Sequence, residues 1–168
     1  MFVSRTGVLL VGVALYGLTG SCTRLPDVQG NGEAFLQGKW DQDSAKVTGE
    51  RLNYSLHKFS FTCDSFYLDL TTYSKVNYYA DSCFNSGVWQ EYAKGTYVVR
   101  GDTLLLAGVY TKANYKQKIS GCYNSGQYIR SFKILSKSDS TLDLESTDNQ
   151  KIVSMNLKER KACVPQPL

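Results

Sequence analysis

The stretch that decides the fold is Phe59-Ser60-Phe61-Thr62-Cys63-Asp64-Ser65-Phe66-Tyr67-Leu68-Asp69-Leu70. Apolar and polar side chains alternate on both sides of its centre, and a period of two is typical of β-strands with one buried face. The central Cys63-Asp64-Ser65 predicts a tight turn. The two runs therefore form an antiparallel hairpin.

The strand that enters this hairpin covers residues 52–62 and shows a change of face. Leu52, Tyr54 and Leu56 have the opposite parity from the two phenylalanines that follow them. Because one extra residue moves the apolar set to the other side of a strand, this change predicts a β-bulge.

The same alternation recurs along the chain and predicts eight strands. We expect them at 38–41, 52–62, 66–73, 88–99, 103–110, 127–135, 141–146 and 152–158. Since hairpins join most of them, the expected fold class is all-β, an eight-stranded up-and-down antiparallel barrel. A two-sheet sandwich stays open as the alternative, because periodicity does not distinguish the two.

The first 22 residues predict an export signal. Arg5 supplies positive charge, a short apolar run follows, and Thr19-Gly20-Ser21 precedes Cys22. The run is too short and too interrupted by glycine to form a permanent membrane-spanning helix. A signal that ends in small residues and a cysteine resembles the lipobox of bacterial lipoproteins, although Thr19 stands where that family usually has an apolar residue. The resemblance implies that Cys22 becomes the first mature residue and carries acyl chains such as palmitate. Plain secretion with an unmodified Cys22 is the alternative.

The chain is expected to have three parts, a lipoprotein signal peptide over 1–21, a flexible tether over 22–33 and one β-barrel domain over 34–168. The tether is rich in proline, glycine and polar residues, which do not favour burial. The lipid on Cys22 would attach the barrel to a membrane of the cell envelope. We expect an outer-membrane lipoprotein that faces the periplasm, because the residues after Cys22 lack the acidic cluster that often directs lipoproteins to the cell exterior.

Charge excludes one class of partner. The full chain has a net charge of +4 and no run of basic residues. Dispersed charges of both signs are typical of a solvated surface, so we expect no nucleic-acid partner.

Four cysteines follow Cys22, and an even number in an exported chain predicts two disulfides. Cysteine, aromatic, Asn, Ser and Gly occur in the same order at 83–87 and 122–126, each time before a predicted strand. Two similar loops that enter strands are expected to lie side by side, so we pair Cys83 with Cys122. Cys63 then pairs with Cys163, although the sequence alone allows three pairings. No CxxC spacing occurs, so no metal site or other cofactor is expected.

Two resemblances to known families follow from these residues. Gly38-Lys39-Trp40 resembles the Gly-x-Trp start of lipocalin-like barrels, which implies that Trp40 plugs one barrel end and that Arg160 packs over it. The order of Cys63-Asp64-Ser65-Phe66-Tyr67, Asp81-Ser82-Cys83 and the final Cys-Val-Pro-Gln-Pro-Leu resembles a family of small bacterial lipoproteins, some of which carry the name fumarate hydratase.

The hydratase activity that the second resemblance implies needs a base and groups that hold an aci-carboxylate. The chain lacks the Gly-Ser-Ser-x-Met-Pro loop of one fumarase class, and disulfide-bonded cysteines cannot bind the iron–sulfur cluster of the other. The single histidine, His57, lies within a strand away from any nucleophile motif, and we assign it a structural or surface role. We therefore assign no catalytic residue.

Aromatic residues are the candidates for ligand binding. Six tyrosines fall at or beyond strand ends, beside the long connections 74–87 and 112–126, and these are Tyr73, Tyr78, Tyr79, Tyr110, Tyr115 and Tyr123. Aromatic rings at a barrel mouth stack on sugar rings or contact apolar ligands. The alternative is a tyrosine cap over a barrel filled by its own side chains.

The leading hypothesis is a non-enzymatic envelope lipoprotein whose barrel binds a small hydrophobic molecule, a glycan or another envelope protein. The second hypothesis is a structural or inhibitory module that binds a partner protein and no small ligand. An enzyme of the hydratase type is the third and least favoured.

Overall fold

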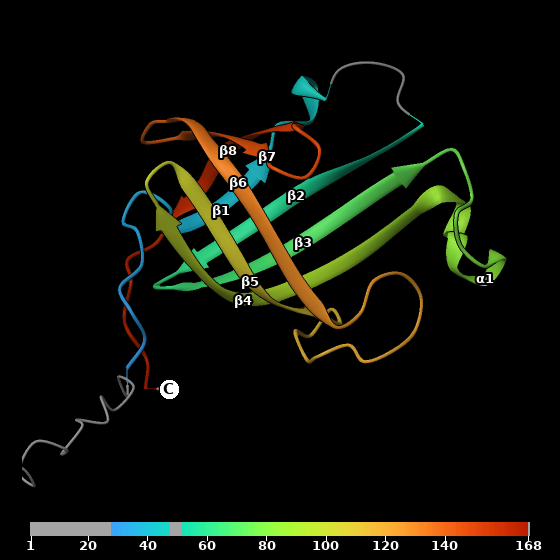
Figure 1. Cartoon of the computed structure of the whole chain (residues 1–168), viewed down its shortest axis with the longest axis horizontal. Coiled ribbons are helices and arrows are strands. Elements are labelled where there is room, and N and C mark those ends of the chain that lie inside the picture. The colour runs from blue at the N-terminus through green and yellow to red at the C-terminus, as the bar shows by residue number, and fades with distance from the viewer. Residues whose placement is uncertain (1–27, 48–51, 168) are drawn as a thin grey trace, which may run out of the picture.

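The computed structural model describes residues 28–47 and 52–167, and its strands close into a single barrel (Figure 1). The strands are β1 (Gly38–Gln42), β2 (Asn53–Thr62), β3 (Ser65–Ser74), β4 (Val88–Arg100), β5 (Thr103–Thr111), β6 (Gln127–Lys137), β7 (Thr141–Ser146) and β8 (Ile152–Arg160). Each strand is antiparallel to its neighbours in sequence, and β1 pairs with β8 to close the sheet. This confirms the all-β, eight-stranded up-and-down barrel and excludes the sandwich.

The helical elements of the described ranges are short. They are η1 (Ser44–Lys46), α1 (Asp81–Phe84) and η2 (Asn85–Gly87), and α1 and η2 lie in the connection between β3 and β4. No helix in the described part of the chain has the length and apolar character needed to cross a membrane.

The bulge expected in the second strand is wrong. β2 and β3 pair without a register shift from Asn53 opposite Ser74 to Thr62 opposite Ser65. The inward face of β2 therefore carries Ser55 and His57 in line with the buried Phe59. The apolar pattern changes because the inward face of β2 becomes polar toward one end of the barrel.

The other end of the barrel is closed by a packed core. Trp40 is fully buried there, and its indole N–H donates to the Leu36 carbonyl at 2.8 Å. The guanidinium of Arg160 lies 5.6 Å from the centre of the Trp40 ring and donates to the Phe35 and Asp139 carbonyls. From this end the core extends into the barrel through buried side chains of every strand, among them Phe59, Phe61, Phe66, Leu68, Leu104, Leu106, Phe132, Leu142, Leu144, Val153 and Met155.

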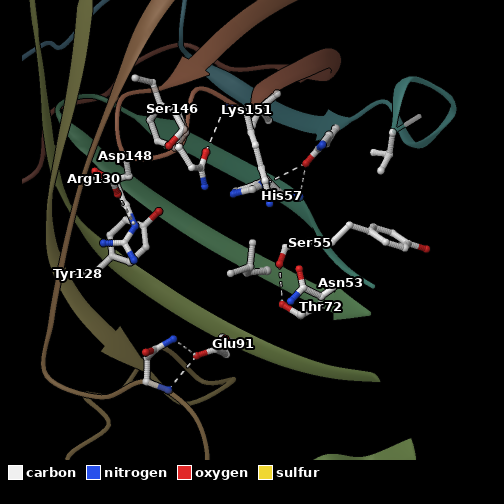
Figure 2. Close-up of a pocket in the computed structure, with 18 of the residues that line it drawn as sticks. Asn53, Ser55, His57, Thr72, Glu91, Tyr128, Arg130, Ser146, Asp148 and Lys151 are labelled. Atoms are coloured by element: carbon white, nitrogen blue, oxygen red, sulfur yellow. Dashed lines mark hydrogen bonds and ion pairs between the residues drawn. The ribbon is translucent and has the colours of Figure 1, made fainter. Parts of the chain in front are cut away.

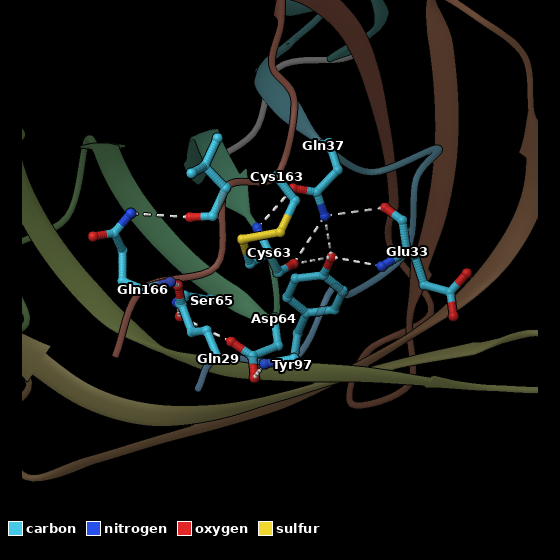
Figure 3. Close-up of a disulfide and its surroundings, with 11 residues drawn as sticks. Gln29, Glu33, Gln37, Cys63, Asp64, Ser65, Tyr97, Cys163 and Gln166 are labelled. Atoms are coloured by element: carbon cyan, nitrogen blue, oxygen red, sulfur yellow. Dashed lines mark hydrogen bonds between the residues drawn. A yellow bond between two sulfur atoms is a disulfide. The ribbon is translucent and has the colours of Figure 1, made fainter. Parts of the chain in front are cut away.

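A buried hydrogen-bond network lies at the closed end beside one disulfide (Figure 3). The Gln37 amide donates to the Cys63 carbonyl at 2.8 Å and accepts from the Cys63 N–H at 2.7 Å. The Tyr97 hydroxyl donates to the same carbonyl at 2.7 Å and accepts from the Glu33 N–H at 3.0 Å. The Cys63–Cys163 bond, confirmed here, ties the C-terminal segment to the β2–β3 turn.

Part of the expected tether is attached to the closed end. Val28 forms an antiparallel bridge with Pro167, and the Gln29 N–H donates to the Gln166 carbonyl at 2.9 Å. The Gly30 N–H donates to Asp64 at 2.9 Å. Residues 28–33 thus run along the barrel instead of forming a free linker. The signal peptide and Cys22 lie outside the described residues.

Candidate ligand-binding pocket

A cavity opens at the barrel end opposite the Cys63–Cys163 disulfide. Its volume is about 550 Å³, within the range of small-molecule sites. Inward-facing side chains of β2 to β6 and the turn between β7 and β8 line it. The barrel is therefore packed at one end and hollow at the other.

β2 and β3 give the cavity a polar wall (Figure 2). Asn53, Ser55 and His57 occupy successive inward positions of β2. The Ser55 hydroxyl lies 2.8 Å from the hydroxyl of Thr72 on β3. Inward polar groups make hydrogen bonds available to anything that enters, which an apolar core does not.

His57 presents a hydrogen-bond acceptor. The Gln42 side-chain oxygen accepts from the His57 backbone N–H at 3.0 Å and contacts the ring Nδ1 at 2.8 Å. Since an atom that accepts from a backbone N–H is an oxygen, Nδ1 must carry the ring proton and Nε2 a lone pair. Burial lowers the pKa of His57 to about 4, and the positive charge of Arg130 adds to this effect. The ring is therefore neutral at pH 7.

Arg130 on β6 brings a positive charge to the cavity. Its guanidinium lies 5.5 Å from the centre of the Tyr128 ring, and its Nε lies 3.6 Å from Asp148 in the β7–β8 turn. One terminal nitrogen donates to the Ile129 carbonyl at 2.8 Å. The side chain remains 42% exposed, so part of its donor set faces the open volume.

Glu91 on β4 holds a loop in place. Its side chain is 6% exposed, and one carboxylate oxygen accepts from the Asn124 backbone N–H at 3.0 Å and from the Asn124 amide at 2.8 Å. The other oxygen accepts from the Trp89 indole N–H at 3.3 Å. Three donors satisfy the carboxylate and fix the 112–126 connection to the barrel wall.

Four of the six candidate tyrosines gather at the mouth. Tyr78, Tyr79 and Tyr110 line the cavity. Tyr123 stacks on Trp89 with ring centres 4.9 Å apart, and Tyr79 lies perpendicular to both. Beside them the Cys83–Cys122 disulfide joins the two long connections and confirms the expected pairing.

The other two candidates, Tyr73 and Tyr115, do not line the cavity. Even-numbered residues of β3 face inward, so Tyr73 points outward and stacks on Tyr54 at 4.9 Å. The connection carrying Tyr115 folds back along the outside of the barrel, where its hydroxyl donates to Asp69 and its ring packs on Tyr67.

Sequence reasoning missed His57, Glu91 and Arg130 as cavity residues. The alternation of strand residues could have identified two of them, because residues two positions apart face the same side. Glu91 lies two positions from the buried Trp89, and Arg130 lies two positions from the buried Tyr128. A charged side chain at an inward strand position indicates a cavity or an internal ion pair.

The cavity offers hydrogen-bonding groups, aromatic rings and the cation of Arg130 to a molecule that enters it. The side-chain partner of His57 is Gln42, so no nucleophile is paired with the histidine among the described residues. Within 28–47 and 52–167 no group of three or more His, Cys, Asp or Glu is arranged to hold a metal ion.

No family model, curated protein or solved structure matches the chain.

Proposed function

We propose that this chain is an envelope lipoprotein whose barrel binds a small amphipathic molecule. The proposal rests on the cavity of about 550 Å³, whose lining combines hydrogen-bonding groups with aromatic rings. A ring-bearing ligand with polar substituents uses both kinds of surface.

The inward polar residues support binding over a purely structural role. Asn53, Ser55 and His57 stand where apolar side chains would extend the core and stabilise the barrel. Positions that break the pattern of a core are expected at functional sites. The second hypothesis, a module that binds a partner protein and no small ligand, gives no role to these inward polar side chains.

The attachment of residues 28–33 suggests how an anchored barrel is oriented. Cys22 lies six positions before Val28, and six residues of chain span at most about 21 Å. Val28 lies beside the C-terminal segment at the closed end. A lipid on Cys22 would hold that end near the membrane, with the cavity mouth directed away. The ligand would then enter from the aqueous side.

Anchoring is tested by fractionating cells that express the chain with and without Cys22→Ser. We expect the unaltered protein in the membrane fraction and the variant in the soluble envelope fraction. Recovery of both in the soluble fraction would contradict the lipid anchor.

Binding is tested with N-phenyl-1-naphthylamine, a neutral dye that fluoresces in apolar surroundings. Thr72→Phe adds a ring to the cavity wall, and Thr71→Phe adds the same ring at the neighbouring outward position. We expect the dye to bind the unaltered protein and Thr71→Phe, and to bind Thr72→Phe at least about tenfold more weakly. Equal binding by both variants, with unchanged circular dichroism, would place the dye outside the cavity and contradict the proposal.

A further inference from the structure

We propose that the cavity selects organic anions, with Arg130 binding the anionic group of the ligand and Lys151 adding positive charge to the same lining. The inference rests on the proposed function and specifies its ligand class. Such a ligand carries a carboxylate, a phosphate ester or a sulfonate. All three groups are oxyanions, planar or tetrahedral, that accept several hydrogen bonds.

The charges of the lining favour an anion. Lys46, Arg130 and Lys151 line the cavity, against Glu91 and Asp148. With His57 neutral, the lining has an excess of one positive charge. In Figure 2 the side chain of Lys151 extends from the β7–β8 turn toward His57, while Arg130 and Glu91 come from different walls.

Glu91 differs from the cations in how fully its charge is satisfied by hydrogen bonds. Three hydrogen-bond donors surround the Glu91 carboxylate, and two of these bonds hold the loop at Asn124. A cationic ligand would have to compete with these bonds. Arg130, in contrast, is 3.6 Å from Asp148, longer than a hydrogen bond, and Lys151 forms no ion pair with any described residue.

The geometry of Arg130 suits an oxyanion. Its guanidinium is held over the Tyr128 ring and by the Ile129 carbonyl, so little freedom is lost when it binds. Its second terminal nitrogen makes no hydrogen bond to a described residue. A fixed guanidinium with free donors at a partly enclosed site recognises carboxylate, phosphate and sulfonate groups.

The surroundings define the rest of the ligand. Leu70, Phe132 and Val153 form apolar parts of the lining, and the polar wall of β2 lies beside them. The His57 Nε2 lone pair accepts from a hydroxyl or amide of the ligand. The structure thus fits an amphipathic organic anion better than a neutral or cationic molecule of the same shape.

A pair of dyes with a common body tests this inference. 1-Anilinonaphthalene-8-sulfonate carries a sulfonate that N-phenyl-1-naphthylamine lacks. Both are titrated into the full chain carrying Cys22→Ser, which avoids detergent, and into the same chain with Arg130→Gln. Arg100→Gln, at the β4–β5 turn of the closed end, is the matched control for loss of one positive charge.

We expect the sulfonate dye to bind at least about tenfold more tightly than the neutral dye, since a charge-assisted hydrogen bond contributes this much or more. Arg130→Gln should remove most of that preference and leave the neutral dye within about twofold. Lys151→Gln should reduce it by a smaller factor, and Arg100→Gln should leave it unchanged.

Three results would overturn the inference. Equal affinity for the two dyes, or an equal loss of both in Arg130→Gln, would show that no anion site exists, while the proposed binding function would stand because the neutral dye still binds. Sulfonate binding that survives Thr72→Phe would place the anion outside the cavity. Binding of neither dye would instead contradict the proposed function itself.

Discussion

The single histidine gives the barrel a pH dependence that can be calculated. Burial lowers the pKa of His57 to about 4 in the folded protein, against 6.5 for an ordinary histidine side chain. The unfolded chain therefore binds more protons than the folded one between these values. Stability must rise with pH in that window and fall as the pH drops from about 6.5 toward 4.

The size of the effect follows from the two pKa values. Each unit of pKa difference corresponds to about 1.4 kcal/mol, so the full loss below pH 4 is roughly 3 kcal/mol. Between pH 7 and pH 5 the same two values give a loss of about 2 kcal/mol in the free energy of unfolding. Few carboxylates titrate in this interval, and the chain has no other histidine to contribute.

The assay is urea unfolding of the unaltered protein and of His57→Gln at pH 7, 6 and 5. We expect the unaltered protein to lose about 2 kcal/mol over this range and the variant to lose little. Proton NMR of the lone imidazole should show a neutral ring down to about pH 4. The same pH dependence in both proteins, or an imidazole that titrates near 6.5, would refute the buried, neutral histidine.

Two further predictions concern the closed end and the disulfides. Tyr97→Phe removes the hydroxyl that joins Glu33 to the Cys63 carbonyl, and it should lower the free energy of unfolding by about 1–3 kcal/mol in urea titrations; a change below about 0.5 kcal/mol would contradict the network. Replacing both cysteines of a disulfide by serine should cost about 4.7 kcal/mol for the pair 63/163 and about 4 kcal/mol for the pair 83/122, because the separations are 100 and 39 residues. A larger cost for the shorter loop would contradict the loop-entropy argument.

The strands were predictable because the alternation is local. The expected strand at 88–99 corresponds to β4 (Val88–Arg100), and the expected strand at 127–135 to β6 (Gln127–Lys137). The repeated Cys-aromatic-Asn-Ser-Gly loops correctly indicated the Cys83–Cys122 bond. Short-range patterns and repeated loops were therefore enough to predict the strands and the Cys83–Cys122 disulfide.

The site was not predictable from the same pattern. Alternation identifies the inward face of a strand by its apolar residues, so the polar inward face of β2 at Ser55 and His57 was interpreted as a bulge. Whether inward positions meet other side chains or empty space depends on how eight strands close around one another. The contacts of Glu91 with Asn124 and of Arg130 with Asp148 join distant segments, which no local pattern encodes.

The central claim is that the cavity holds a ligand, and native mass spectrometry of the protein extracted from its own membranes tests it most directly. The account predicts a mass, beyond that of any acyl chains, that disappears on denaturation and is absent from Thr72→Phe. Its value would identify the compound, and its ionisation would show whether it is an anion. Identical native and denatured masses after subtraction of the acyl chains would contradict the account and indicate an unoccupied barrel.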